Sequence, residues 1–317
     1  MAELIWTAQL PTQAWVTTGS VTLVPKLKSL LVSDGWGCAF AGTRLRRLDL
    51  KTGKELCNFR PRSSINAADH DEETKTILTN SDKKIFLLSE NMEELDRWDR
   101  KVPAYMHSIM RIGNTLAMKN GRIDTVTLYD LDSMKIQRVK VGKGRPLLRE
   151  SRDTLLACCG EDGNVWRFAK NDLRKPTLLL EGTRFIDSSL DQKTKTLWMS
   201  EGELYADTQY SVRSPGPSYG RVSVLSLKDE SIVAQYKLKV KFELLSVTNG
   251  AQFLWLTQAV DAKDVFVFST DKKLQEIERF KIPRNGKFSF MDAQLGLIFT
   301  ESRTKDDKSL LLSCWKL

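Results

Sequence analysis

The chain contains few of the residues and motifs from which most catalytic and metal sites are built. Its 317 residues include only five cysteines and two histidines. The cysteines form no Cys-x-x-Cys pair, and an odd number of them fits neither a disulfide framework nor a zinc site. No phosphate-binding loop, dinucleotide-binding fingerprint or calcium-binding loop occurs. The sequence therefore predicts no metal site and no cofactor, and it shows no catalytic constellation.

Long apolar runs are missing as well. No apolar stretch approaches the roughly 20 residues that a membrane-spanning helix needs. The first residues, MAELIWTAQLPTQAWVTTGS, lack the basic start and apolar core of a secretory signal. Reduced, mostly buried cysteines are typical of proteins inside the cell. We therefore expect an intracellular, cytoplasmic protein without membrane insertion.

The overall composition is that of a globular protein with an excess of positive charge. Hydrophobic residues make up 41% and charged residues 28% of the chain, which is enough apolar material for a sizeable core. The formal net charge is +9. Such a charge favours an acidic partner, which includes nucleic acid, an anionic membrane surface and acidic peptides.

One short apolar pattern occurs seven times along the chain, in segments such as KSLLVSD, DTLLACC and KTLWMSE. A second β-rich segment that ends in turn-forming residues follows each copy. No helical periodicity is sustained over three turns, so the chain is predicted to be all-β. Trp198 and Trp255 lie inside copies of the pattern and are expected in the core. The central Leu or Ile of the copies falls at positions 30, 77, 116, 155, 197, 254 and 297.

The spacing of the copies, 39 to 57 residues, is close to the blade length of β-propellers. Four strands fit each repeat, which predicts a seven-bladed β-propeller and a single domain over residues 1–317. The first blade has an extra strand before it, and the last blade lacks one. We therefore expect Leu4–Leu10 to pair with Leu310–Leu317, so that the last blade is completed and two sheet edges are covered.

The segment VGKGRPLLRESRDTLLACCGEDGNVWRF, residues 141–168, combines a Gly/Pro approach, a strand, a turn and a second strand. Together with the repeats, it resembles the seven-bladed propellers of the WD-repeat and YVTN type. The resemblance covers nearly the whole chain as architecture. It implies the propeller fold, and it carries no active-site residue over to this sequence.

Strand alternation places the loop between the second and third strands on the same face as the connection to the next blade. The spacing of the repeats assigns an insertion at about 202–221 to this loop in blade five. The insertion is rich in tyrosine and arginine, which are typical of binding loops. The candidate partner-binding residues in it are Tyr205, Tyr210, Arg213, Tyr219 and Arg221.

The connections between blades add a second group of candidates. Six of them carry a cation 12 to 15 residues before the next copy of the pattern. Cations that converge on one face create a positive potential that attracts anionic groups. These candidate residues are Arg62, Lys101, Lys143, Arg184, Lys241 and Arg284, with Arg145 close by.

These features favour a non-enzymatic interaction platform, a scaffold subunit that binds an acidic peptide or protein through a basic, loop-rich face. Two alternatives remain open. One is a small-molecule enzyme of the lactonase or lyase kind, with a site at the channel mouth near His107, Arg145 and Arg184. The other is a nucleic-acid-binding propeller in which tyrosines stack on bases beside arginines.

Overall fold

The repeated β-rich segments form antiparallel sheets of four strands. In the computed structural model, the described residues form twenty-eight strands in seven such sheets. We letter the strands of each sheet A to D in the order of the sheet. The residues that the structure describes are 2–11, 18–34, 44–61, 65–81, 84–99, 106–120, 123–144, 146–151, 153–204, 215–239, 241–258, 263–271, 274–305 and 309–317.

The first three sheets take their strands in chain order, from β2 to β13. Their strands are β2 (Thr18–Val24), β3 (Ser29–Asp34), β4 (Leu45–Asp49) and β5 (Glu55–Phe59); β6 (Ile65–Asp71), β7 (Thr76–Ser81), β8 (Lys84–Ser89) and β9 (Glu94–Asp99); and β10 (Met106–Ile112), β11 (Thr115–Asn120), β12 (Thr125–Asp130) and β13 (Ile136–Lys140).

The next three sheets repeat this order, from β14 to β25. Their strands are β14 (Pro146–Glu150), β15 (Thr154–Cys159), β16 (Asn164–Ala169) and β17 (Asp172–Leu180); β18 (Phe185–Asp191), β19 (Thr196–Leu204), β20 (Pro215–Ser226) and β21 (Ser231–Lys237); and β22 (Leu244–Val247), β23 (Phe253–Thr257), β24 (Asp264–Ser269) and β25 (Gln275–Lys281).

The seventh sheet joins the two ends of the chain. Its strands A to C are β26 (Lys287–Asp292), β27 (Leu297–Arg303) and β28 (Ser309–Lys316), and its strand D is β1 (Glu3–Pro11). The register of β1 and β28 runs from Glu3 opposite Lys316 to Pro11 opposite Ser309. The predicted pairing of the terminal strands is therefore confirmed, and so is the seven-bladed β-propeller.

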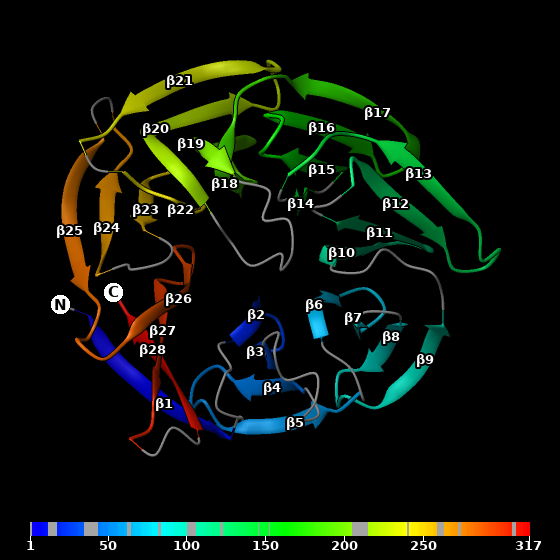
Figure 1. Cartoon of the computed structure of the whole chain (residues 1–317), viewed down its shortest axis with the longest axis horizontal. Helices are drawn as coiled ribbons and strands as arrows, with labels where there is room; N and C mark the ends of the chain where they lie inside the picture. Colours follow the sequence, from blue (N-terminus) through cyan, green and yellow to red (C-terminus); the bar gives the residue numbers. More distant parts are fainter. Residues whose placement is uncertain are drawn as a thin grey trace. The chain divides into compact units, whose positions relative to one another are not determined.

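The chain divides into two compact units. The larger unit comprises residues 119–128 and 136–297, and the smaller unit comprises 2–118, 129–135 and 298–317. In the larger unit the A strands β14, β18, β22 and β26 lie beside one another in this order (Figure 1). In the smaller unit β2, β6 and β10 do the same. The prediction of one domain over 1–317 is not tested by this division and stays a prediction.

The terminal strand β1 is fixed to the smaller unit by Trp6. Its indole Nε1 donates a hydrogen bond to the carbonyl oxygen of Leu50, at 2.8 Å. The ring lies on Gly53, where an added Cβ would come within 2.5 Å of the indole. Gly53 also has φ +69, so this turn needs glycine both for its backbone and for the close approach.

The blade cores are built from alternating residues of the inner strands. Trp198 is 4% exposed and Trp255 is 5% exposed, which confirms that both are core residues. Trp198 stacks on Tyr236 with 6.1 Å between the ring centroids. The described residues include no helix that is long and apolar enough to cross a membrane.

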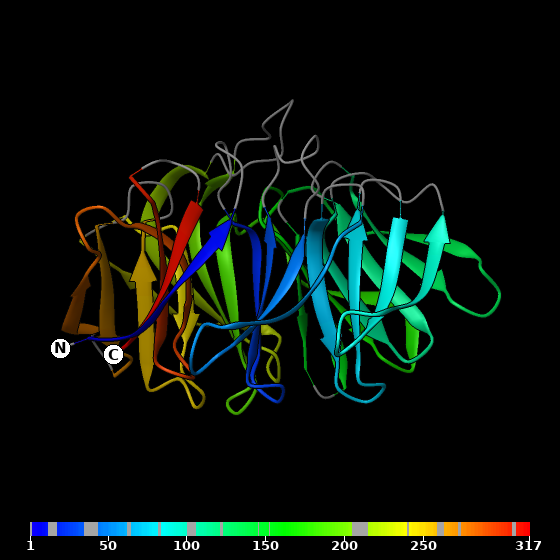
Figure 2. The same cartoon turned by 90° about the horizontal axis from the view of Figure 1, so that it is seen from below.

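The A–B and C–D turns lie at one end of the sheets, which we call the turn end. Figure 2 shows the turns after β2 and β6 at the same end of the smaller unit's sheets. Aspartates recur at the turn end and accept hydrogen bonds from the backbone two or three residues ahead. Asp49, Asp71, Asp130, Asp191 and Asp292 make such bonds.

Candidate functional site

The opposite end of the sheets carries the B–C loops and the D–A connections between sheets, and we call it the loop end. In the larger unit these segments are hydrogen-bonded to each other. The N–H of Phe185, which ends one connection, donates to the carbonyl of Gly160 in a B–C turn. The N–H of Thr183 in the same connection donates to the carbonyl of Gly163 in that turn. Loops and connections therefore share one surface in this unit.

The insertion of blade five starts as an extended hairpin. Residues 202–204 and 215–221, which we expected in a loop, belong to strands β19 and β20. Gly202 pairs with Ser218, and the register shifts on both sides of this pair. Such bulges let a hairpin continue with an extra residue on one strand, even through a Pro-Gly-Pro segment. Tyr205, Tyr210 and Arg213 lie outside the described residues.

A cavity of about 370 Å³ opens at the base of this hairpin. We call it the arginine pocket. It brings together three of the candidate residues, Arg184 from the connection before β18 and Tyr219 and Arg221 from β20. Glu201 and Gln235 also line it.

Glu201 holds Arg221 in place. Its side chain is 4% exposed, and its Oε2 lies 2.8 Å from Nη2 of Arg221. Its Oε1 accepts hydrogen bonds from the hydroxyl of Ser223 and from Nε2 of Gln235. A buried carboxylate with all these partners is satisfied and fixes the guanidinium next to it. The side chain of Arg221 is 49% exposed and lines the cavity.

Tyr219 forms the second half of the pocket. Its hydroxyl donates to Oε1 of Glu203 at 2.9 Å, and this bond raises the pKa of Tyr219. The guanidinium carbon of Arg221 lies 5.7 Å from the centroid of the Tyr219 ring. Arg184 is held only weakly, because its Nη1 is 4.0 Å from Glu203 and its side chain is 58% exposed. Two guanidinium groups thus line one cavity, and guanidinium groups match the geometry of carboxylate and phosphate groups.

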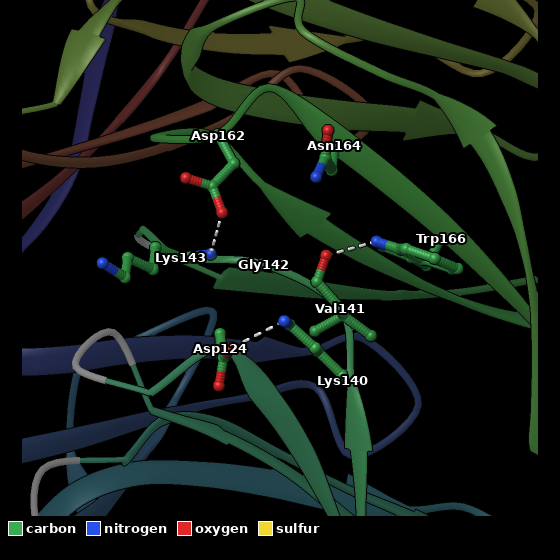
Figure 3. Close-up of a pocket in the computed structure, with 8 residues that line it drawn as sticks. All are labelled: Asp124, Lys140, Val141, Gly142, Lys143, Asp162, Asn164 and Trp166. Atoms are coloured by element: carbon green, nitrogen blue, oxygen red, sulfur yellow. Dashed lines mark hydrogen bonds and ion pairs between the residues drawn. The ribbon is translucent and has the colours of Figure 1, made fainter.

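A second cavity of about 480 Å³ lies between the connection after β13 and the B–C turn after β15 (Figure 3). We call it the tryptophan pocket. Trp166 donates its indole N–H to the carbonyl of Val141. The backbone N–H of Lys143 donates to Oδ2 of Asp162 at 2.6 Å. Asp124 and Lys140 line the other side of this cavity.

Three further candidate cations are exposed at the loop end, namely Lys143, Lys241 and Arg284. Within the described part of the chain, none of the three side chains forms an ion pair. Arg62, Lys101 and Arg145 lie outside the described residues, so the predicted ring of cations is described only in part.

The residues of the alternative enzyme site are also described only in part. The side chain of His107 is not among those described, and Arg145 is outside the described residues as a whole. The other histidine, His70, is buried, and its Nε2 lies 3.0 Å from Oε1 of Glu90. Among the residues described, no group of three His, Cys, Asp or Glu side chains could hold a metal ion.

Glu201, Glu203 and Trp166 were not among the residues predicted from the sequence. Glu201 is the last residue of the pattern copy KTLWMSE, where a charged residue follows the buried residues of β19. This position could have indicated a buried ion pair. Trp166 gave no signal for a pocket, because its partner Val141 is 25 residues away.

No protein-family model matches the chain, and no curated protein does. Two solved structures resemble it over nearly their whole lengths. The beta-propeller domain of Myceliophteria thermophila Cps50 (Swd1) has a TM-score of 0.67 at 9% identity, with 100% of both chains covered. The Neurospora crassa Pan2 WD40 domain has a TM-score of 0.69 at 8% identity, with 98% of this chain and 95% of that one covered. Identity this low shows the fold alone, and that fold is a WD-repeat-like, seven-bladed β-propeller.

Proposed function

We propose that this propeller is a non-enzymatic, intracellular interaction platform that binds an acidic peptide or protein segment at its loop end. The observation that carries the proposal is the arginine pocket. There, Arg184 and Arg221 flank one cavity, and Tyr219 lines it beside them. Arginine and tyrosine are among the residues most often found at the energetic centre of protein interfaces.

The charge balance of the loop end supports an anionic partner. Glu201 is buried and fully used by its hydrogen-bond partners, while Arg184 and Arg221 are about half exposed. The exposed Lys143, Lys241 and Arg284 add positive charge to the same end of the sheets. Exposed cations around a binding site speed the association of an acidic partner and make it depend on salt.

An intracellular location is supported by the cysteines. Cys57, Cys158, Cys159 and Cys314 are free thiols. Burial raises the pKa of Cys158 to about 11 and that of Cys159 to about 12, so both stay protonated at neutral pH. Proteins with buried, unpaired thiols are typical of reducing compartments.

The test is a matched pair of charge-reversal variants. The double variant Lys143→Glu and Arg184→Glu changes the loop end, and Lys175→Glu with Lys228→Glu makes the same change in net charge elsewhere on the larger unit. Peptides selected from a random display library against the wild-type protein would be labelled and measured by fluorescence anisotropy. We expect acidic peptides to be selected, and the loop-end variant to bind them at least about tenfold more weakly.

The control variant should change the affinity by less than about twofold. Equal losses in both variants would show a non-specific effect of net charge and would contradict the proposal. Selection of neutral or basic peptides, or tighter binding of a single-stranded oligonucleotide than of any peptide, would also overturn it. Both variants alter exposed side chains, so their unfolding free energies should stay within about 0.5 kcal/mol of the wild type.

A further inference from the structure

The two cavities of the loop end are separated by one thin wall. The wall consists of the B–C turn after β15 and the connection before β18. Asp162 of the turn and Asn164, the first residue of β16, line the tryptophan pocket, and Gly182 and Arg184 of the connection line the arginine pocket. Each segment therefore has one side in a cavity and the other side against its neighbour.

The wall is tightly packed. The N–H of Thr183 donates to the carbonyl of Gly163 at 3.2 Å, and the N–H of Gly182 lies 3.4 Å from Oδ1 of Asn164. A Cβ on Gly163 would lie 2.5 Å from the backbone of Thr183, and this glycine has φ +73. Two backbone segments in such contact leave no room for a side chain between them, so the two cavities stay adjacent at a fixed spacing.

The lining of the tryptophan pocket includes the large apolar side chain of Trp166. The indole N–H of Trp166 is used by Val141, so the rest of its side chain is apolar. Gly142 adds no side chain, and its φ of +139 is a backbone conformation that favours glycine. A cavity of this size lies within the range of pockets that bind small ligands or single large side chains.

The rim of the tryptophan pocket carries the charges. The side chain of Lys140 is 85% exposed and its Nζ lies 3.9 Å from Oδ2 of Asp124, and Lys143 is exposed. Asp162 already accepts the backbone N–H of Lys143. Asp162 is exposed as well, and the side chain of Asp124 is 43% exposed, so this rim carries charges of both signs.

We propose that the two pockets form one bipartite site for an acidic peptide segment. A large apolar side chain of the segment, aromatic or branched aliphatic, enters the tryptophan pocket and packs on Trp166. A carboxylate of the same segment crosses the wall and binds between Arg184 and Arg221. The inference rests on the proposed function and adds the apolar anchor, which makes the site select sequences that net charge alone would not distinguish.

The direct test observes Trp166 itself. The full chain would be produced with 5-fluorotryptophan, and its Trp166 ¹⁹F resonance assigned with Trp166→Phe. Three synthetic peptides would be titrated: one of glutamate and serine with a single phenylalanine, one with alanine in place of phenylalanine, and one with glutamine in place of glutamate. The position of the phenylalanine relative to the glutamates would be varied.

We expect the phenylalanine peptide to shift the Trp166 resonance at one preferred spacing. The alanine peptide should bind about tenfold more weakly and leave this resonance in place. The glutamine peptide should also bind more weakly, but at saturation it should still shift Trp166. A phenylalanine peptide that binds without moving the Trp166 resonance would overturn the inference.

A second pair of variants tests the anchor separately from the acidic site. Gly142→Ala would bring a Cβ within 3.0 Å of Oδ2 of Asp162 and narrow the tryptophan pocket. Gly113→Ala is the matched control, because its φ is also positive, at +55, and an added Cβ there meets nothing within 4 Å. Gly142→Ala should remove the advantage of phenylalanine over alanine, and Gly113→Ala should keep it.

The outcomes separate the two proposals. If acidic peptides bind equally well with phenylalanine or alanine in both variants and in the wild type, the bipartite site is wrong and the acidic platform stands. If no acidic peptide binds the wild type at all, the proposed function itself fails.

Discussion

The two ends of the larger unit's sheets each contain a fully buried charged side chain. One of them accepts hydrogen bonds from backbone N–H groups, and the other donates hydrogen bonds to backbone carbonyls. At the turn end, Asp191 accepts hydrogen bonds from the N–H groups of Lys193 and Gly250 and from the hydroxyl of Thr194. At the loop end, the ammonium of Lys119 donates hydrogen bonds to the carbonyls of Asn120 and Ile123. Both Asp191 and Lys119 are 0% exposed.

We infer from this difference that the repeated turns of the turn end stabilise the blades, while the segments of the loop end differ from blade to blade. The aspartate arrangement recurs at several turns, each time closing a short turn within two or three residues. The hydrogen bonds of Lys119, by contrast, are particular to this loop. Burial disfavours the charged ammonium and lowers the pKa of Lys119. A repeated local turn specifies the blades, while loops built one by one can present different pockets.

We expect the largest effect from a substitution at the turn end, where the N-terminal strand β1 packs on the turn at Gly53. Trp6→Ala removes an indole that is 7% exposed and that packs on Gly53 and on Phe299, 6.1 Å away between ring centroids. We expect the free energy of unfolding to fall by about 3–5 kcal/mol, as for other large core truncations. Denaturant unfolding measures this directly.

The neighbouring Thr7→Ala is the control, because Thr7 lies on the same strand and its hydroxyl makes an exposed hydrogen bond with that of Ser313. Its effect should stay below about 1 kcal/mol. Equal effects of the two substitutions would mean that β1 is held by its backbone pairing alone.

A smaller effect compares the two buried charges. Asp191→Ala leaves the backbone N–H groups of Lys193, Thr194 and Gly250 and the hydroxyl of Thr194 without their acceptor, so we expect a loss of about 2–4 kcal/mol. Lys119→Met removes the donor from two carbonyls but also removes the cost of burying an ammonium, so we expect only about 1–2 kcal/mol. Urea unfolding of both variants tests the order. A larger loss for Lys119→Met would contradict the view that the turn end carries the fold.

The sequence predicted the repeated parts of the molecule well because their signals are local. The apolar pattern repeats in every blade, and an aspartate followed by a threonine, as in Asp191 and Thr194, indicates a turn within four residues. The pockets could not be predicted in the same way. Glu201 reaches Arg221 through the register of β19 with β20, in which the two residues are directly opposite each other, and the sequence alone does not show this register.

The candidate residues illustrate the same limit. Arg184, Tyr219 and Arg221 were selected for their chemistry, and the structure places them beside one cavity. The spacing of the repeats put them on one face, but it contained no information about Glu203, which contacts both Arg184 and Tyr219. Contacts between side chains on different strands depend on register and twist rather than on sequence distance.

The smallest expected effect concerns two aspartates that make the same kind of turn in different surroundings. The bonds from Thr52 lower the pKa of Asp49, while burial raises the pKa of Asp292. By linkage, the stabilisation from Asp49 is present above its unfolded pKa of about 3.9 and is lost as the pH falls through its lower folded pKa. Asp292 has the opposite sign, because the fold gains stability as the pH falls through its raised pKa.

Asp49→Asn should therefore be less stable than the wild type at neutral pH, and the difference should vanish on acidification. Asp292→Asn keeps an acceptor for the N–H of Leu295 and never carries the partly buried charge, so its stability should fall relative to that of the wild type as the pH falls. Unfolding free energies measured from pH 7 down to about pH 3 compare the two. Parallel profiles of the two variants would contradict the opposite pKa shifts of Asp49 and Asp292.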